Sequence, residues 1–508
     1  MPLDKLSFAQ YAYPEEYEKI VDYSSVSQMW QYCVDAYADN VAIIDAGREF
    51  TFSAFEADVA AFRATLLAHG VKQGDNVGVF APNSAEFAKA FLAITTLGAV
   101  AVLLPPHLDE ITVFGCSMKF ALSALVYTEP LQAKLAVLQA KNPNVALIDV
   151  ATPAQASAPA VAVDGNAPCT VLFTGGTTGR SKGALLSHRA VMLGTRNGCY
   201  GFRGIFAQRY LLVLPLTHVF GLIRNLLTSL YTGSTLFICR NNKDMFKDIA
   251  MFRPTTLILV PALAEMALNL SKQFGRNMLG ADMRTIICGA ATVPHYLSVE
   301  YAKLGITLLP GYGLTESANL VSGNPIPLEK PQSVGIVYPG IECKLVDDEL
   351  WLKGDNMLLS YVGEPEENAT AFEDGWFKTG DLARFDEDGF LYITGRKKEI
   401  IVLSSGENVS PAEIENHFYA IDGIQDCLVY ENMDEGKSAL VLEVVPRMAV
   451  LKPLGISDVP AYLKGQIDAV NATLPPFQRI NKVIFRDTDF VRTPSMKIAR
   501  NQNGNAKK

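Results

Sequence analysis

The chain has 508 residues, of which 49% are hydrophobic and 19% charged, so two or more domains with a large buried core are expected. A formal net charge of -9 argues against nucleic-acid binding as the main role, because nucleic-acid-binding domains are usually basic. The eight cysteines form no C-x-x-C pair and show no metal-ligand spacing with the six histidines, which favours reduced thiols in a cytoplasmic protein.

Neither the N-terminus nor the most apolar stretch indicates membrane insertion. The opening "MPLDKLSFAQYAYPEEYEK" has no apolar core of a secretory signal. Residues 210–233, "YLLVLPLTHVFGLIRNLLTSLYTG", are interrupted by Pro215, His218, Arg224 and Asn225. A buried strand and a buried helix joined by a turn therefore explain this stretch better than one membrane span. At most a peripheral contact with a membrane is expected.

Short apolar runs alternate with helical patterns through most of the chain. "NVGVF" at 76–80 is followed by the helix-like "SAEFAKAFLAITTLGA" and then by "VAVLL" at 100–104. The same alternation continues from "TVLFT" to "ITLLPGYG", which ends at residue 313. Buried strands separated by helices predict mainly parallel sheets covered on both faces. Residues 152–168, rich in proline and alanine, predict a linker between two lobes of this region.

The pattern changes after about residue 395. A short strand and a glycine turn precede a helix that Ser410 would cap, with Pro411 at its first position. The later runs predict a small α+β domain of about a hundred residues. The predicted fold class is thus α/β, with a large N-terminal domain over residues 1–397 and a small, mobile α+β domain over residues 398–508.

The segment "TGGTTGRSKG", residues 174–183, has the composition of a phosphate-binding loop. Its glycines let the backbone approach a ligand, its threonines supply hydroxyl donors, and Lys182 supplies a cation. It is not a Walker A loop, because Arg180 and Ser181 separate Gly179 from the lysine. An ordinary glycine turn is the alternative. The candidate nucleotide-binding residues here are Thr174, Gly175, Gly176, Thr177, Thr178, Gly179 and Lys182.

Three further motifs follow this loop in order: "GYGLTES" at 311–317, "GWFKTGDLARFDEDGFLYITGRKKEI" at 375–400 and "RTPSMKIAR" at 492–500. From about residue 40 to residue 500 the chain resembles the adenylate-forming superfamily. That superfamily includes acyl-CoA ligases, nonribosomal peptide adenylation domains and firefly-type luciferases. The resemblance implies that a carboxylate attacks the α-phosphate of ATP bound with Mg²⁺. The resulting acyl-adenylate then gives a thioester when a thiol displaces AMP.

The resemblance also implies roles for single residues. Glu316 would hold Mg²⁺, a hard ion that prefers carboxylate oxygen, and Thr315 would hydrogen-bond the α-phosphate. Tyr312 would stack on adenine, Asp381 would accept the ribose hydroxyls, and Arg396 would contact ribose or phosphate. Taken alone, a Thr-Glu pair after a strand is more often a helix cap. The stretch that ends in Gly289, Ala290 and Ala291 would form one wall of the adenine and acyl pocket, and Gly311 and Gly313 are further candidate nucleotide-binding residues.

The C-terminal domain would supply the catalytic lysine. Lys497 matches the family lysine that bridges the carboxylate and the α-phosphate, although lysines near a C-terminus are usually solvated. Lys398 matches a hinge about which the small domain would rotate after adenylation. That rotation would remove Lys497 and bring Gly406 to line a channel for the thiol.

The segment "LPLTHVFGL" at 214–222 limits the class of acid that the protein could activate. Amino-acid-activating relatives carry an aspartate here for the substrate ammonium, and this chain has none. The surroundings favour a hydrophobic acid, fatty, aryl or alicyclic, with His218 gating the acyl pocket; a core histidine is the alternative. Coenzyme A is the expected thiol, and a separate acyl carrier protein is the alternative acceptor.

Overall fold

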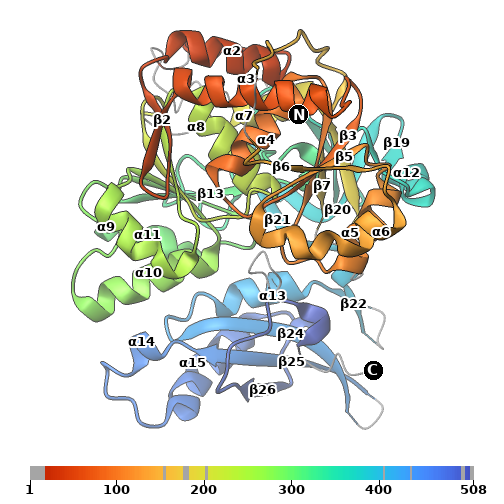
Figure 1. Cartoon of the computed structure of the whole chain (residues 1–508). Helices are drawn as coiled ribbons and strands as arrows, with labels where there is room; N and C mark the ends of the chain where they lie inside the picture. Colours follow the sequence, from red (N-terminus) through yellow and green to blue (C-terminus); the bar gives the residue numbers. More distant parts are fainter. Residues whose placement is uncertain are drawn as a thin grey trace.

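A computed structural model describes residues 16, 18–152, 156–174, 182–200, 204–403, 407–434, 437–492 and 498–503. The smaller C-terminal part, blue in Figure 1, lies below the larger N-terminal part. Separate clusters of buried hydrophobic residues occupy the two parts, one ending at Leu391 and the other beginning at Val409. The predicted fold class is confirmed, whereas the exact boundary between residues 397 and 398 stays a prediction.

The first sheet of the large part has seven strands in the order β18-β8-β7-β4-β3-β5-β6. The strands β7, β4, β3, β5 and β6 run parallel, as the apolar runs predicted. In chain order the strands are β3 Asn76–Phe80, β4 Val100–Leu104, β5 Ala124–Tyr127, β6 Ala146–Asp149, β7 Pro168–Phe173, β8 Gly183–Ser187 and β18 Ser360–Tyr361. Helix α3 Phe52–Ala68 precedes β3, and the helices between the strands are α4 Ala85–Thr96, α5 Glu110–Lys119 and α6 Ala136–Lys141.

The prediction of an interlobe linker at 152–168 is wrong. This segment joins β6 to β7, two strands of the same sheet. The backbone N–H of Ala158 donates to the Ala60 carbonyl, and that of Val161 donates to the Thr96 carbonyl, each over 2.9 Å. The segment therefore packs on helices α3 and α4. Proline and alanine indicated an irregular path correctly, but composition does not distinguish a linker from a segment packed against the surface of one domain.

The second sheet has nine strands in the order β15-β14-β13-β12-β11-β9-β10-β1-β2. Its parallel strands β9, β11, β12 and β13 end at one edge, where ligands bind in open α/β sheets. The strands are β1 Val41–Asp45, β2 Arg48–Thr51, β9 Arg209–Leu212, β10 Thr235–Ile238, β11 Thr256–Leu259, β12 Thr285–Cys288, β13 Thr307–Tyr312, β14 Ser322–Gly323 and β15 Ile336–Val337. The associated helices are α2 Val26–Ala36, α7 His188–Asn197, α8 Thr228–Tyr231, α9 Met245–Phe252, α10 Pro261–Phe274 and α11 His295–Lys303.

The apolar stretch at 210–233 folds as predicted, into a buried strand and a buried helix. Strand β9 is followed by the π-helix η4, Phe220–Leu227, which continues into α8. Over the described residues, we find no helix that combines the length and the apolar character needed to span a membrane.

A five-stranded antiparallel sheet carries the chain from the large part toward the small one. Its strands are β16 Glu342–Val346, β17 Glu349–Lys353, β19 Phe372–Glu373, β20 Trp376–Phe385 and β21 Leu391–Arg396, with helix α12 Pro365–Ala371 beside them. The β16–β17 hairpin turns at Asp347 and Asp348, with φ of 50° and 62°. Strands β20 and β21 pair so that Asp381 lies opposite Arg396.

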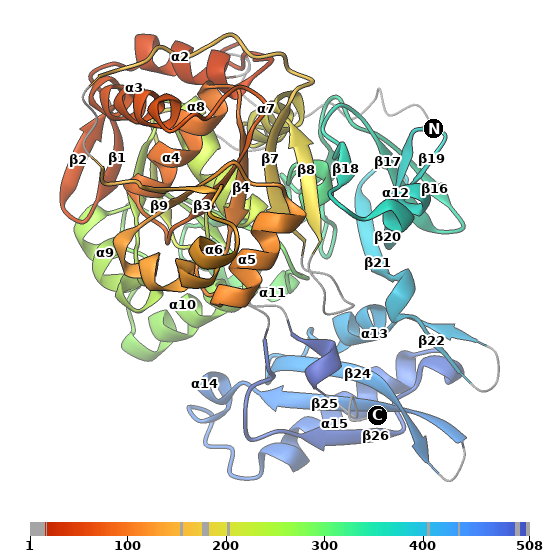
Figure 2. The ribbon, with the colours of Figure 1, turned by 45° about the vertical axis from the view of Figure 1, so that its right-hand side comes forward.

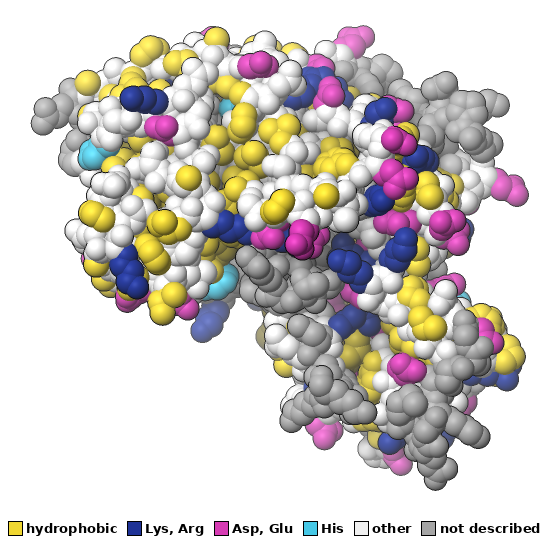
Figure 3. All heavy atoms as spheres, turned by 90° about the vertical axis from the view of Figure 1, so that its right-hand side faces the viewer, with side chains coloured by type: hydrophobic (Ala, Val, Ile, Leu, Met, Phe, Trp, Pro, Cys, Tyr) yellow, Lys and Arg dark blue, Asp and Glu magenta, His cyan; other side chains and the backbone are white. Residues whose placement is uncertain are grey.

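The small part contains a three-stranded sheet covered by helices. Its elements are β22 Ile401–Val402, β23 Asn408–Val409, α13 Pro411–Phe418, β24 Ile424–Asp434, β25 Lys437–Pro446, α14 Met448–Leu451, α15 Val459–Thr473 and β26 Lys482–Phe485. The Ser410 hydroxyl accepts from the Glu413 N–H and Pro411 follows it, which confirms the predicted helix start. Figure 2 shows α13 facing the large part, and Figure 3 shows basic and acidic side chains gathered where the two parts meet.

Candidate active site

The base of the glycine-rich loop is formed by strands β7 and β8. The Thr174 N–H donates to the Lys182 carbonyl over 2.8 Å, which closes the ends of the loop. Lys182 Nζ lies 2.7 Å from Glu367 Oε2 and 5.3 Å from the centroid of the Tyr361 ring. A bound polyphosphate would compete with Glu367 for this ammonium. The predicted ligands Gly175, Gly176, Thr177, Thr178 and Gly179 lie outside the described residues.

The motif "GYGLTES" forms a tight turn at the end of β13. A Cβ added at Gly313 would lie 1.2 Å from the Asn319 carbonyl oxygen, so glycine is required for this close approach. The chain then turns through Ala318 and Asn319, whose φ values are 50° and 87°. Non-glycine residues adopt such values infrequently, and they often do so at functional sites. The turn lies beside Thr315, which is buried, and Glu316, which is half-buried.

Glu316 and Lys182 are connected through Tyr361. The Tyr361 hydroxyl donates to Glu316 Oε1 over 2.8 Å, while its ring lies beneath the Lys182 ammonium. Burial, and next the Glu316 carboxylate, raise the pKa of Tyr361, so this hydroxyl stays protonated and donates. Tyr361 thus contacts a carboxylate through its hydroxyl and a cation through its ring face, near the loop predicted to bind phosphate. Sequence reasoning missed Tyr361, since no polar pattern marks it within its apolar run.

Asp381 is the centre of a second cluster. This carboxylate is 5% exposed; its Oδ2 accepts from the Tyr312 hydroxyl over 2.5 Å, and its Oδ1 accepts from Arg396 Nε over 2.7 Å. The Asp381 carboxylate raises the pKa of Arg396, and burial, followed by the same carboxylate, raises that of Tyr312. A carboxylate offers about four acceptor positions, so Asp381 retains capacity for ribose hydroxyls.

The small residues at the strand ends lie close together. A Cβ added at Gly289 would lie 3.0 Å from the Gly311 carbonyl oxygen and 3.7 Å from the Phe220 ring. Ala290 follows with a φ of 67°, and Ala291 is exposed. The ends of β12 and β13 and the start of η4 therefore meet at one place. The predicted pocket-wall residues Gly289 and Ala290 and the predicted nucleotide-binding residue Gly311 are brought together there.

His218 lies just before the π-helix η4. Its Nδ1 accepts from the Phe220 N–H over 3.3 Å, and its carbonyl accepts from the Leu222 N–H over 2.9 Å. The side chain is half-buried. Because Phe220 lies beside Gly289, His218 belongs to the same edge of the second sheet as the other candidate residues. This position fits a residue at the mouth of an acyl pocket.

Of the three residues assigned to the small domain, the structure describes Lys398. Lys398 is exposed in the short 3-10 helix Lys397–Glu399, directly after β21. Its neighbour Lys397 pairs with the buried Glu349 over 3.0 Å. Lys497 and Gly406 lie outside the described residues, so the roles predicted for them stay predictions.

Metal binding depends on few protein ligands. Within the described residues no group of three or more His, Cys, Asp or Glu side chains is arranged to hold a metal ion. Glu316 nevertheless fits Mg²⁺, because this ion is usually bound by one or two carboxylates together with substrate phosphates. The hydrogen bond from Tyr361 occupies only part of the acceptor capacity of Glu316.

Comparison with known proteins agrees with this geometry. The family model described as "AMP-binding enzyme" matches residues 30–362, and that described as "AMP-binding enzyme C-terminal domain" matches residues 398–506. A medium-chain fatty-acid–CoA ligase of Escherichia coli K12 is 28% identical, over 86% of this chain and 84% of its own length. A long-chain-fatty-acid–CoA ligase of Salmonella typhimurium is 30% identical, over 80% of this chain and 82% of its own length.

Solved structures with the same fold cover nearly the whole chain. An anthranilate CoA ligase in complex with anthranoyl-AMP superposes with a TM-score of 0.84 at 21% identity, covering 95% of this chain and 97% of that one. The o-succinylbenzoate CoA synthetase of Bacillus subtilis, in complex with its acyl-adenylate intermediate, gives a TM-score of 0.77 at 25% identity. The two coverages are 93% and 97%.

Proposed function

Because this chain belongs to the AMP-binding enzyme family, we propose that it is an AMP-forming acid–CoA ligase. It activates a hydrophobic carboxylic acid, fatty or aryl, as an acyl-adenylate and transfers the acyl group to coenzyme A. The relatives described above support both halves, since they are CoA ligases and two solved neighbours carry acyl-adenylates. The observation that carries the proposal is the Lys182–Tyr361–Glu316 arrangement beside the Tyr312–Asp381–Arg396 cluster.

In the first half-reaction a carboxylate oxygen of the acid attacks the α-phosphorus of ATP, and pyrophosphate leaves. Two anions must approach, so cations and oriented donors are needed at the phosphates. Lys182 and the hydroxyl of Thr315 are suited to this role, and Mg²⁺ held by Glu316 would neutralise phosphate charge. Asp381 would hold the ribose while its hydrogen bond from Tyr312 orients that ring toward adenine.

In the second half-reaction the sulfur of coenzyme A attacks the acyl carbon, AMP leaves, and the thiol proton is released. We assign Lys497 to the first step only, with rotation of the small domain about Lys398 exposing the acyl-adenylate and bringing Gly406 to the thiol channel. Such domain motions commonly separate the steps of a reaction.

The cytoplasm is the proposed location. All eight cysteines lie within the described residues and none forms a disulfide, as is usual in a reducing compartment. Coenzyme A dissolved in that compartment would be the acceptor.

The proposal is tested with purified protein, ATP, Mg²⁺ and a panel of fatty and aryl acids, by measuring AMP release with and without coenzyme A. We expect AMP release that requires both an acid and coenzyme A. Acid-dependent pyrophosphate exchange without turnover of coenzyme A would indicate a carrier-protein loader instead. No acid-dependent reaction with ATP would reject the proposal.

A further inference from the structure

The ammonium of Lys182, the cation of the glycine-rich loop, is paired with a carboxylate of the protein itself. Its Nζ lies 2.7 Å from Oε2 of Glu367 on α12 and 5.3 Å from the centroid of the Tyr361 ring. The side chain of Lys182 is 17% exposed and that of Glu367 is 40% exposed. Glu367 can therefore move toward solvent, whereas the lysine is largely enclosed.

The backbone on both sides of this ion pair is held in place. Lys182 directly precedes β8, and β8 pairs with β18, which leads into α12. The Asn368 side chain fastens α12 to the end of β18: its Oδ1 accepts from the Tyr361 N–H over 2.7 Å, and its Nδ2 donates to the Tyr361 carbonyl over 2.8 Å. Glu367, the neighbour of Asn368, thus faces Lys182 from a fixed backbone, and the pairing orders little more than two side chains.

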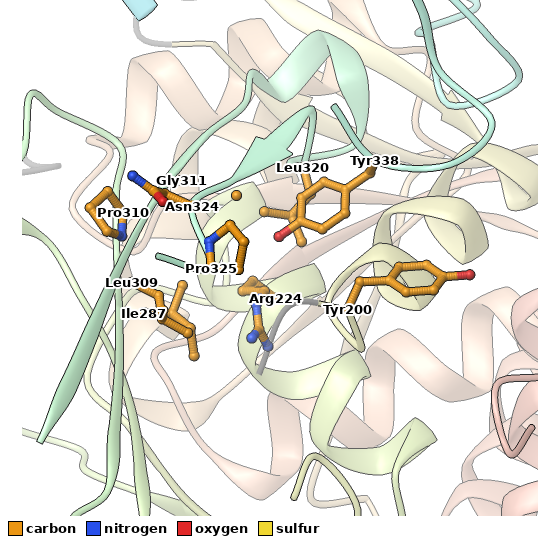
Figure 4. Close-up of a pocket in the computed structure, with 11 residues that line it drawn as sticks. Tyr200, Arg224, Ile287, Leu309, Pro310, Gly311, Leu320, Asn324, Pro325 and Tyr338 are labelled. Atoms are coloured by element: carbon orange, nitrogen blue, oxygen red, sulfur yellow. The ribbon is translucent and has the colours of Figure 1, made fainter. Parts of the chain in front are cut away.

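Another cation near the candidate site, Arg224, is not placed to bind a polyphosphate. Figure 4 shows its side chain in the cavity that Ile287, Leu309 and Pro325 also line. Arg224 is 2% exposed, and the space open to water in this cavity is about 20 Å³, enough for about one water molecule. The charge balance at Lys182 therefore matters for phosphate binding.

A phosphate group and the Glu367 carboxylate are alternative partners for Lys182. Both are anions whose oxygens accept charge-assisted hydrogen bonds from an ammonium. A lysine has three donors and could contact both at once, but the two anions would then lie side by side and repel each other. In either case the carboxylate opposes the binding of phosphate.

We infer that Glu367 is an internal counter-ion of Lys182 that lowers the affinity of the site for ATP and for the departing pyrophosphate. This inference rests on the proposed function and adds to it a residue that determines how tightly the polyphosphate is held. An ammonium that held ATP and the transition state equally tightly would lower KM without raising kcat. Glu367 weakens this hold, and it pairs with Lys182 again as pyrophosphate leaves.

The test measures binding of ATP and of pyrophosphate, each with Mg²⁺ and without any acid, by titration calorimetry. The proteins are the wild type, Glu367→Gln and the control Glu366→Gln. Glutamine keeps the shape of glutamate and removes its charge. Glu366 is the exposed residue before Glu367 on α12, so the control changes the net charge equally. Lys182→Met, alone and combined with Glu367→Gln, completes a double-mutant cycle.

We expect Glu367→Gln to bind ATP and pyrophosphate ~2- to 5-fold more tightly, the factor that a partly exposed ion pair of this kind provides. Inhibition of acid-dependent AMP release by pyrophosphate should strengthen by a similar factor. Glu366→Gln should bind both ligands like the wild type. In the Lys182→Met background, Glu367→Gln should have little effect, because the shared partner is gone.

Unchanged binding in Glu367→Gln would overturn the inference, and so would weaker binding, which would show that the carboxylate orients the ammonium for phosphate. An equal gain in Glu366→Gln, or a full gain in the Lys182→Met background, would reveal a general charge effect and would also overturn it. The expected affinities without any acid-dependent AMP release would support the counter-ion role and reject the proposed function. A wild type that binds no ATP would overturn both.

Discussion

The contact between the two parts of the molecule gives a quantitative prediction about how the small domain is held. Glu265 on α10 accepts from the Tyr296 hydroxyl over 2.6 Å and from Arg447 Nε over 3.1 Å. The Arg447 guanidinium lies 3.9 Å from the centroid of the Tyr296 ring and donates to the Asp422 carbonyl. Its side chain is 3% exposed. Arg447 therefore fastens the small domain to α10 and α11.

We predict that Arg447→Met releases the small domain from this position. Loss of one member of a buried ion pair costs about 3–5 kcal/mol. The lower end applies, because burial raises the pKa of Glu265 to about 7 even though Arg447 acts to lower it, so the carboxyl takes up a proton more readily once this cation is removed. A cost of about 3 kcal/mol corresponds to a change of ~100-fold in the ratio of docked to released protein.

The measurement is the distance distribution between spin labels on cysteines introduced at the exposed positions Gln273 and Lys452. The parent protein is expected to give one short distance, and Arg447→Met a broad distribution that extends to longer ones. Lys464→Met is the control, because Lys464 pairs with Asp468 on the surface of α15 and exposed pairs contribute little. A distribution in Arg447→Met identical to that of the parent would refute the reasoning.

Three further predictions concern single residues. Because burial raises the pKa of Glu265 to about 7, docking of the small domain takes up a proton, so docking should weaken as the pH rises toward 7 and stay constant above pH 7. Glu265→Gln should remove this pH dependence of the spin-label distances. An unaltered pH dependence in this variant would contradict the prediction. Gly313→Ala should abolish pyrophosphate exchange and lower stability by at least ~1–3 kcal/mol, since its Cβ would overlap a carbonyl oxygen. The control Gly465→Ala, with open space around its Cβ, should be neutral or stabilising, and equal thermal unfolding of the two variants would exclude the steric argument. Tyr361→Phe removes the donor to Glu316 and should shift the Mg²⁺ midpoint of the exchange reaction by up to ~10-fold; an unchanged midpoint would separate Tyr361 from the metal site.

The sequence predicted the elements that local patterns encode. Alternating buried strands and helices predicted the parallel sheets, and Ser410 with Pro411 predicted a helix start, because both depend on neighbours in the chain. The interpretation of 152–168 as an interlobe linker failed, since the pairing of β7 with β4 depends on residues far apart in sequence.

In the candidate site, too, local motifs were predictable from the sequence, whereas contacts between residues far apart in the sequence were not. Its motifs predicted Asp381 with its partners Tyr312 and Arg396, and they predicted Glu316, but Tyr361, the hydrogen-bond donor to Glu316, was missed.

The central claim is that this chain forms an acyl-adenylate, and isotope transfer tests it most directly. An acid labelled with ¹⁸O in its carboxylate is incubated with the protein, ATP, Mg²⁺ and coenzyme A, and the AMP produced is analysed by mass spectrometry. Attack of the carboxylate on the α-phosphorus predicts one labelled oxygen in each AMP, because that oxygen stays with phosphorus when the thiol displaces AMP. Unlabelled AMP, or label in inorganic phosphate, would contradict the account.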